Sequence, residues 1–282
     1  MSNRVVLLDG AVGTSLWEKS ENKVPVWRYN VENPEIVRQL HEEFVDAGAQ
    51  IILANTFAAN VTSVKGTGYQ VKDIIKNALK IARDAVAGRA RIALAVGPLA
   101  NLLEPYGDIS ADSAYDAFDE QIGYGVEYGA DLIFIQTFID LEMMKIALKV
   151  ANRHDIPVFC SFSFDKKGRT MMGNSVKDIV EALKIFKVDA IGLNCSLGPD
   201  AAVPVIEQFS KNTNLPLIFK PNAGKTTIAN GEVVSEYDID TFVDDSLPSL
   251  QYGVKYIGGC CGANASYIEK LRERLVQLNY IE

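Results

Sequence analysis

The chain has 282 residues, of which 48% are hydrophobic and 23% are charged, proportions typical of soluble globular proteins. Its formal net charge of −8, without any cluster of lysine and arginine, argues against a nucleic-acid partner. No apolar run approaches the roughly 18 residues of a membrane span, and the N-terminal apolar segment is too short for a secretion signal. We therefore expect a cytoplasmic protein that does not bind membranes.

Short apolar runs alternate with longer amphipathic segments along the whole chain. The runs are typical of β-strands because they are brief, rich in β-branched residues and followed by turn residues. They cover residues 5–8, 51–54, 92–96, 132–135, 157–162, 190–193, 217–219 and 256–258. The segments between them predict helices over residues 34–47, 71–87, 112–128, 141–153, 176–186, 201–212, 238–252 and 266–278.

The spacing of apolar residues supports the helices. In the segment 35–45, apolar residues at positions 36, 37, 40, 44 and 45 recur at the helical period. Gly48, Gly129 and Gly253 each stand between a predicted helix and the next strand, where glycine commonly ends a helix.

Eight strand–helix units predict a single (β/α)8 TIM barrel that covers residues 1–282. Continuous apolar strands indicate a parallel sheet covered by helices. The alternative is an open, doubly wound sheet. Such a sheet usually carries a glycine-rich loop after its first strand, but residues 9–14 lack the G-x-G-x-x-G spacing.

Three of the four cysteines follow predicted strands. Cys195 comes after the sixth strand, and Cys260 and Cys261 come after the eighth. The carboxyl ends of barrel strands meet at the face that carries active sites, so these thiols can converge there. Three thiolates suit Zn²⁺ and leave one coordination position open. A thiol that enters this position would lose its proton and become a nucleophile suited to attack on a methyl group.

Other roles for the cysteines and histidines remain open. The adjacent cysteines could instead form a strained vicinal disulfide, or their adjacency could be incidental. Cys160 lies inside the fifth predicted strand, where we expect a core residue. His41 and His154 fall within or at the end of predicted helices, so we expect them on the surface and not among the metal ligands.

Further polar residues also follow the predicted strands. They include Asp9, Asn55, Gln136, Asn194, Lys220 and Asn222. Such residues could orient a substrate at the barrel mouth. Two of them have simpler explanations: Asp9 could cap the following segment, and residues 222–224 could form an ordinary turn, since Asn and Gly are favoured in turns.

Five segments together resemble the homocysteine-binding, zinc-dependent S-methyltransferase family. They are residues 9–14, 54–57, 192–196, 221–224 and 258–262. Within this family the chain is most similar to the N-terminal homocysteine module of cobalamin-dependent methionine synthase, through residues 164–169 and 194–199. The resemblance extends over nearly the whole chain.

The resemblance implies an enzyme that transfers a methyl group to L-homocysteine and forms methionine. One Zn²⁺ per chain would be held by Cys195, Cys260 and Cys261 as catalytic residues, with the homocysteine sulfur as fourth ligand. Backbone N–H groups around Gly10 and Ala11 would hold the substrate carboxylate. Asp9 would lie beside the amino group, and the remaining expected substrate contacts are Asn55, Gln136, Asn194 and Asn222.

Two residues depart from the family pattern. Gln136 stands where the family usually carries Glu, and Lys220 stands where the methionine synthase module often carries Glu. Both changes remove negative charge near the expected pocket. Two alternatives follow: recognition of the amino group is weakened or reorganised, or the acceptor is a different thiol.

The resemblance favours methylcobalamin, supplied by a partner, as the methyl donor. We find no Asp-x-His motif for a corrinoid in this chain, so the corrinoid would belong to another protein or to corrinoid and folate modules of a larger one. A small donor is the alternative. A further alternative function is a zinc-containing binding or regulatory barrel in a corrinoid protein complex.

Overall fold

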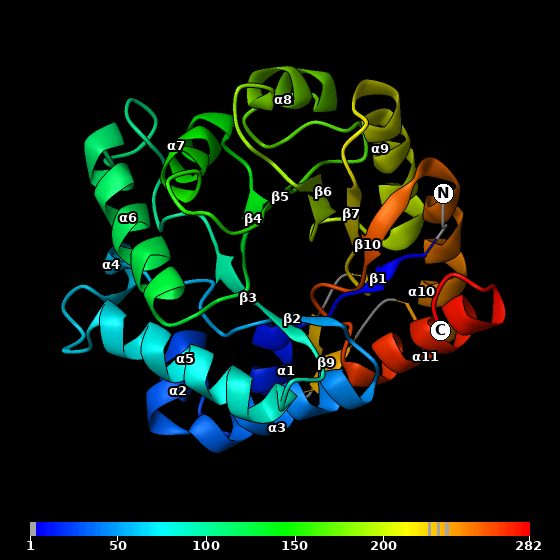
Figure 1. Ribbon diagram of the computed structural model, residues 1–282, viewed down its shortest axis with the longest axis horizontal. Helices are drawn as coiled ribbons and strands as arrows, with labels where there is room; N and C mark the ends of the chain where they lie inside the picture. Colours follow the sequence, from blue (N-terminus) through cyan, green and yellow to red (C-terminus); the bar gives the residue numbers. More distant parts are fainter. Residues whose placement is uncertain (1–3, 225–226, 230–231, 235–236) are drawn as a thin grey trace.

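A parallel β-barrel forms the centre of the molecule (Figure 1). The computed structural model describes residues 4–224, 227–229, 232–234 and 237–282. The barrel strands are β1 (Val6–Leu7), β2 (Ile51–Leu53), β3 (Arg91–Val96), β4 (Leu132–Phe138), β5 (Val158–Phe162), β6 (Ala190–Asn194), β7 (Leu217–Lys220) and β10 (Val254–Ile257). Neighbouring strands pair in the order β1-β10-β7-β6-β5-β4-β3-β2, and a parallel bridge between Leu8 and Ile51 joins the two ends. The predicted TIM barrel is confirmed.

Helices surround the barrel and cover the outer side of its strands (Figure 1). They are α1 (Val12–Lys19), α2 (Tyr29–Glu32), α3 (Pro34–Asp46), α4 (Val61–Val64), α5 (Val71–Val86), α6 (Ala111–Glu127), α7 (Leu141–Ala151), α8 (Val176–Leu183), α9 (Pro199–Asn212), α10 (Ile239–Ser246) and α11 (Ala265–Gln277), with 3₁₀ helices η1 (Val26–Arg28) and η2 (Leu247–Tyr252). No helix within the described ranges is both long and apolar enough to cross a bilayer.

Several elements differ from the sequence-based prediction. The short helices α1, α2 and α4 and the antiparallel hairpin of β8 (Thr227–Ala229) and β9 (Glu232–Val234) were not predicted. The single helix predicted over residues 238–252 is divided, because α10 ends at Ser246 and η2 follows it. Pro248 lies at the start of η2 and lacks the N–H group that an α-helix interior requires.

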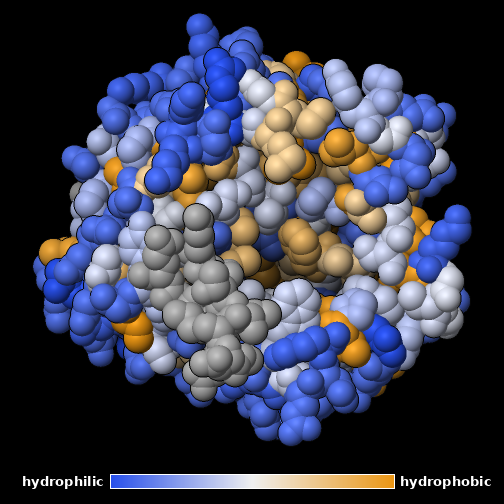
Figure 2. Space-filling view, turned by 180° about the vertical axis from the view of Figure 1, so that it is seen from behind, coloured by the Kyte–Doolittle hydropathy of each residue, from blue (hydrophilic) through white to orange (hydrophobic). Residues whose placement is uncertain are grey.

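The strands separate two hydrophobic cores. One core lies between strands and helices, and the other fills the barrel interior. Side chains inside the barrel alternate along each strand, and the fully buried ones include Leu8, Ile51, Leu53, Ala93, Ala95, Leu132, Phe134, Phe159, Ala190 and Ile218. The same alternation continues into polar residues at the carboxyl ends of three strands, Gln136, Asn194 and Lys220. The barrel is therefore apolar in its body and polar at its mouth, where the molecular surface is hollowed (Figure 2).

His41 is buried, so the prediction that it lies on the surface was wrong. It is 0% exposed within α3, and neither ring nitrogen has a hydrogen-bond partner in the described part of the chain. His41 shares the buried stripe of this helix with Val37 and Phe44, which have the i, i+4, i+7 spacing of a core-facing surface. Burial lowers the pKa of His41 to about 4, because the apolar surroundings disfavour the charged imidazolium.

Replacing His41 with leucine should reduce the loss of folding stability at low pH. The unfolded chain takes up a proton near pH 6.5, whereas folded His41 does so only near pH 4. Native stability is therefore lost as the pH falls between these values, by about 2 kcal/mol at pH 5. Urea unfolding at pH 7 and pH 5 measures the loss of stability in each protein. The other titrating groups affect both proteins alike, so the difference between the two losses reports His41. Equal losses of stability in the two proteins would contradict the prediction.

Candidate metal centre

The structure brings Cys195, Cys260 and Cys261 together at the barrel mouth. Their sulfur atoms lie within 4.8 Å of one another, and the sulfurs of Cys195 and Cys261 are 3.7 Å apart. All three are half-buried free thiols, so the adjacent cysteines form no disulfide. Cys160 is a fully buried core residue, as predicted. The three clustered thiols could hold a metal ion.

The backbone around Cys195 adopts an uncommon conformation. Cys195 and Ser196 have φ angles of 62° and 64°, in the left-handed region that costs non-glycine residues about 1–3 kcal/mol each. Two hydrogen bonds hold this turn: the Cys195 N–H donates to Lys220 O over 3.1 Å, and Leu197 N–H donates to Cys195 O over 2.8 Å. Surrounding contacts therefore impose the conformation, as is common at functional sites.

The segment after β7 connects the two cysteine loops. Cys260 N–H donates to Pro221 O over 2.8 Å, and Ala223 N–H donates to Cys261 O over 2.9 Å. On the other side, this segment accepts the hydrogen bond from Cys195 through Lys220 O. Because β7 lies between β6 and β10, its carboxyl end is placed to fix both loops at once.

The three thiols are arranged to stabilise negative charge on one sulfur. The pKa of Cys260 lies well below that of an ordinary thiol because Cys195 and Cys261 hydrogen-bond to its sulfur, and the positive charge of Lys220 adds to this effect. Interaction with Cys260 raises the pKa of Cys195 to about 12, and interaction with the other two thiols raises the pKa of Cys261. A bound cation would instead favour the thiolate form of all three.

Asn194 links the cysteine cluster to the strands beside it. Its Oδ1 accepts hydrogen bonds from Thr137 N–H (2.8 Å) and Ser161 Oγ (2.7 Å). Its Nδ2 donates to Thr137 Oγ1 (2.7 Å) and lies 3.7 Å from Cys260 Sγ. Asn194 is fully buried, so these contacts fix its amide and direct an N–H group at the sulfur. Such outer contacts commonly orient metal ligands.

Replacing Asn194 with alanine should lower zinc affinity by roughly 10–100-fold, the usual cost of losing a group that supports a metal ligand. The substitution also leaves Thr137 N–H and the Ser161 hydroxyl without their acceptor. Competition with a chromophoric zinc chelator measures the affinity. Asn152→Ala is a matched control, because Asn152 hydrogen-bonds to Lys187 away from the cluster. Wild-type affinity in the Asn194 variant would show that Asn194 does not support the site.

A buried ion pair joins Asp9 and Lys220 beside the cluster. Lys220 Nζ lies 2.5 Å from Asp9 Oδ1 and 3.0 Å from Asp9 O, and the two residues are 1% and 0% exposed. The other carboxylate oxygen accepts from Leu53 N–H over 2.6 Å. Burial raises the pKa of Asp9, and Lys220 opposes this shift. Asp9 does not cap α1, whose N-cap residue is Ala11.

The loop that contains Gly10 and Ala11 packs closely against the loop of Cys260 and Cys261. A Cβ atom on Gly10 would lie 2.0 Å from Ala263 O, so no side chain fits at this position. The N–H of Ala11 donates to Ala263 O over 2.9 Å, and Gly259 N–H donates to Asp9 O over 3.1 Å. The loop expected to bind a carboxylate is thus adjacent to the cysteine cluster, although Ala11 N–H already has a protein acceptor.

The remaining expected substrate contacts differ in how many of their polar groups are already engaged. Asn55 Nδ2 donates to Val26 O and Asn30 Oδ1 over 2.8 and 2.9 Å, so this amide connects protein segments. Gln136 shares the inward-facing side of β4 with Leu132 and Phe134 and is 8% exposed, and no described residue hydrogen-bonds to its side chain. Asn222 Oδ1 likewise lacks a partner within the described residues. Gln136 and Asn222 therefore have polar groups free to bind a ligand.

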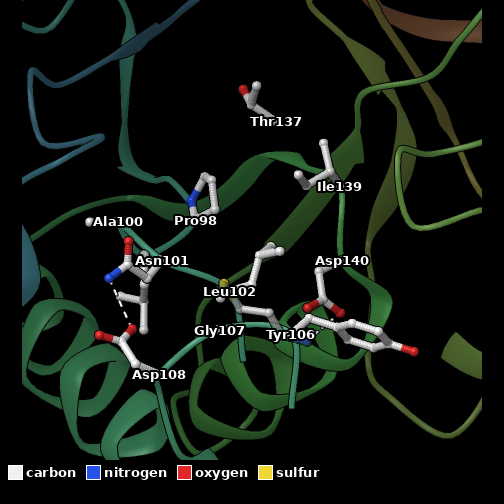
Figure 3. A pocket seen from close by; sticks show the side chains of 12 residues that line it. Pro98, Ala100, Asn101, Leu102, Tyr106, Gly107, Asp108, Thr137, Ile139 and Asp140 are labelled. Carbon is white, nitrogen blue, oxygen red and sulfur yellow. Dashed lines mark hydrogen bonds between the residues drawn. The ribbon is translucent and has the colours of Figure 1, made fainter. Parts of the chain in front are cut away.

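A pocket of about 570 Å³ opens where the chain leaves β3 and β4 (Figure 3). Its walls come from the loop after β3 and from residues at the end of β4 and the start of α7, and Figure 3 shows Asn101 hydrogen-bonded to Asp108 in one wall. Thr137 lines this pocket and also accepts the hydrogen bond from Asn194. Thr137 and Asn194 therefore connect the pocket to the cysteine cluster.

Two contributors to this site were missed from the sequence: Ser161 and the pairing of Lys220 with Asp9. Strand alternation gave a usable signal for Lys220, because a lysine two positions after the inward-facing Ile218 must point into the barrel. A buried lysine needs a counter-ion. Thr137 has a φ angle of 67°, a local reversal that no residue pattern revealed.

The chain is similar in sequence to known methionine synthases. The chain is 26% identical to the methionine synthases of Mycobacterium leprae and Mycobacterium tuberculosis, over 99% and 96% of its own length. It spans about a quarter of the length of these relatives.

The fold also matches solved structures. The metallated homocysteine methyltransferase MmuM from Escherichia coli superposes with a TM-score of 0.82 at 23% identity, over 96% of each chain. The carboxyl transferase domain of Rhizobium etli pyruvate carboxylase reaches 0.58 at 10% identity, over 99% of this chain and 48% of the other. The family described as homocysteine S-methyltransferase matches residues 6–275. Since this match covers almost the entire barrel, the chain belongs to the homocysteine S-methyltransferase family.

Proposed function

We propose that this protein is a zinc-dependent S-methyltransferase that methylates the thiol of L-homocysteine and forms methionine. The observation that carries the proposal is the cluster of three half-buried thiols at the mouth of a barrel of this family. Three sulfur ligands with one open position suit catalytic zinc. The metallated form of the similar MmuM supports a metal in this fold.

Cys195, Cys260 and Cys261 would hold the zinc ion. When bound, zinc lowers the pKa of a thiol that enters its open position, so that the acceptor reacts as a thiolate. The thiol proton leaves to solvent, and the sulfur lone pair forms the new S–CH₃ bond. The bond between the methyl group and the donor breaks, and its electron pair remains on the donor, which departs as the leaving group. Asn194 keeps Cys260 in position. The loop of Asp9, Gly10 and Ala11, with Gln136 and Asn222, surrounds the acceptor head group.

The methyl donor in this proposal is a methylated corrinoid on a partner protein or on other modules of a larger chain. The support is the similarity to methionine synthases, of which this chain matches about a quarter. A donor must reach the acceptor sulfur from the barrel mouth, since the barrel body is filled by side chains. The pocket beside Thr137 provides an approach from this side.

A second candidate function is a zinc-containing binding module of a corrinoid protein complex. The Asp9 carboxylate already has Lys220 as partner, and Gln136 carries no charge, which favours weak recognition of an amino acid. Calorimetry distinguishes the two functions. Zinc-dependent binding of L-homocysteine supports the enzyme, whereas tight binding of a corrinoid protein without binding of homocysteine supports the module.

The direct test is methionine formation by the zinc-loaded protein. L-homocysteine is incubated in parallel with methylcobalamin, a methylated corrinoid protein, S-methylmethionine and betaine, and methionine is quantified by mass spectrometry. We expect turnover with a corrinoid donor and none after removal of zinc. Absence of methionine with all four donors, from protein that retains zinc, would contradict the proposed function.

A further inference from the structure

Few buried carboxylates are available near the thiol cluster to pair with an ammonium group. Within the described residues, the buried carboxylates are those of Asp9 and Asp140. Asp140 caps α7, where its Oδ1 accepts from Glu142 N–H over 2.8 Å and from Met143 N–H over 3.3 Å. Asp9 is therefore the buried acid beside the thiol cluster whose charge could face an acceptor.

The carboxylate of Asp9 already forms an ion pair with Lys220. One oxygen lies 2.5 Å from Lys220 Nζ, and the other accepts from Leu53 N–H over 2.6 Å. The pair carries no net charge, and both of its residues are essentially inaccessible to solvent. A carboxylate engaged in this way has little capacity left for a second cation.

Gln136 does not restore the missing charge. Its side chain is 8% exposed and points toward the mouth, in line with Leu132 and Phe134 along β4. Its amide can accept a hydrogen bond but cannot neutralise an ammonium ion. Moving an ammonium group from water into such a site is unfavourable unless it is paired. The site thus gains little from the amino group of an amino acid, because Lys220 neutralises the nearby acid.

We propose that Lys220 is a specificity-determining residue and that the site accepts anionic thiols without an amino group about as readily as α-amino thiols. This inference rests on the proposed function, because it concerns the acceptor of the same reaction. The relevant substrate class is short aliphatic thiols with a carboxylate. To select against acceptors that lack an ammonium group, the site would need a charged partner for that group. Asp9 could be this partner, but it is already paired with Lys220.

The test compares two thiols that differ only in the amino group, L-homocysteine and 4-mercaptobutanoate. Calorimetry with zinc-loaded wild-type protein measures the dissociation constant of each, and the zinc-free protein is the control. We expect the two constants to differ by less than about tenfold, against the 10⁴-fold or larger discrimination of a site built to bind the missing group. A preference for homocysteine above tenfold overturns the inference and leaves the proposed function intact. Binding of neither thiol overturns the proposed function.

Two variants locate the origin of the selectivity. Gln136→Glu adds a carboxylate where no described residue hydrogen-bonds to the glutamine, and should raise the preference for homocysteine at least tenfold, the gain expected from a charged hydrogen bond. Lys220→Met should also raise the preference for homocysteine, because the Asp9 carboxylate then lacks its lysine partner. Gln277→Glu makes the same charge change at an exposed position at the end of α11 and should leave the preference for homocysteine unchanged. An unchanged preference in folded Gln136→Glu protein overturns the inference, even if Lys220→Met does not fold.

Discussion

Replacing Cys260 or Cys261 with alanine is expected to abolish stable zinc binding and methyl transfer. Zinc held by four protein ligands contributes about 10–16 kcal/mol, so one ligand accounts for about 3 kcal/mol, or roughly 100-fold in affinity. The two remaining thiols would leave the ion with two open positions, and competing chelators would remove it. Metal content after dialysis, measured by atomic emission, and methionine formation both report the loss.

Cys160→Ala is the matched control for these variants. Cys160 is fully buried in β5 and does not belong to the thiol cluster. Burial in apolar surroundings raises its pKa above that of an ordinary thiol, which makes it an unsuitable metal ligand. This variant should retain one zinc ion per chain and remain active. Normal zinc content and normal turnover in both cluster variants would refute the assignment of the metal centre.

Replacing Lys220 with methionine is expected to destabilise the native protein by about 3–5 kcal/mol, the usual cost of removing one partner from a buried ion pair. Methionine preserves most of the side-chain volume, so the loss would arise from the Asp9 carboxylate, which is 0% exposed and would have lost its cation. Urea unfolding at pH 7, with zinc present at equal concentration for both proteins, measures the change in the free energy of unfolding.

A double-mutant cycle separates the ion pair from other effects of the substitution. Asp9→Asn combined with Lys220→Met removes both charges and should recover part of the stability lost in Lys220→Met. Lys80→Met is the surface control. Lys80 pairs with Asp84 on the exposed face of α5, with side chains 73% and 54% accessible, and its loss should cost less than about 1 kcal/mol. Equal, small losses for both lysine variants would contradict a stabilising role for the buried pair.

Local patterns determined most of the barrel. Short continuous apolar runs mark the strands and the helical apolar period marks the helices, and both patterns depend only on residues close together in the chain. This is why all eight predicted strands are found, within one to three residues at their ends. The burial of His41 was predictable from its place on the apolar stripe of α3, but polar residues are usually exposed. The hairpin of β8 and β9 carried no clear strand pattern.

The sequence alone placed Cys195, Cys260 and Cys261 at strand ends, and a parallel barrel necessarily gathers such ends at one face. Only the tertiary structure decided which charges meet there. Asp9 and Lys220 are separated by 211 positions in the chain, and they pair because barrel closure brings β1 close to β7 through β10. Charge pairing depends on distances of a few ångströms, which residue order does not specify. The thiols therefore indicate a candidate metal site from the sequence, whereas the charge pairing beside that site follows from the closed barrel.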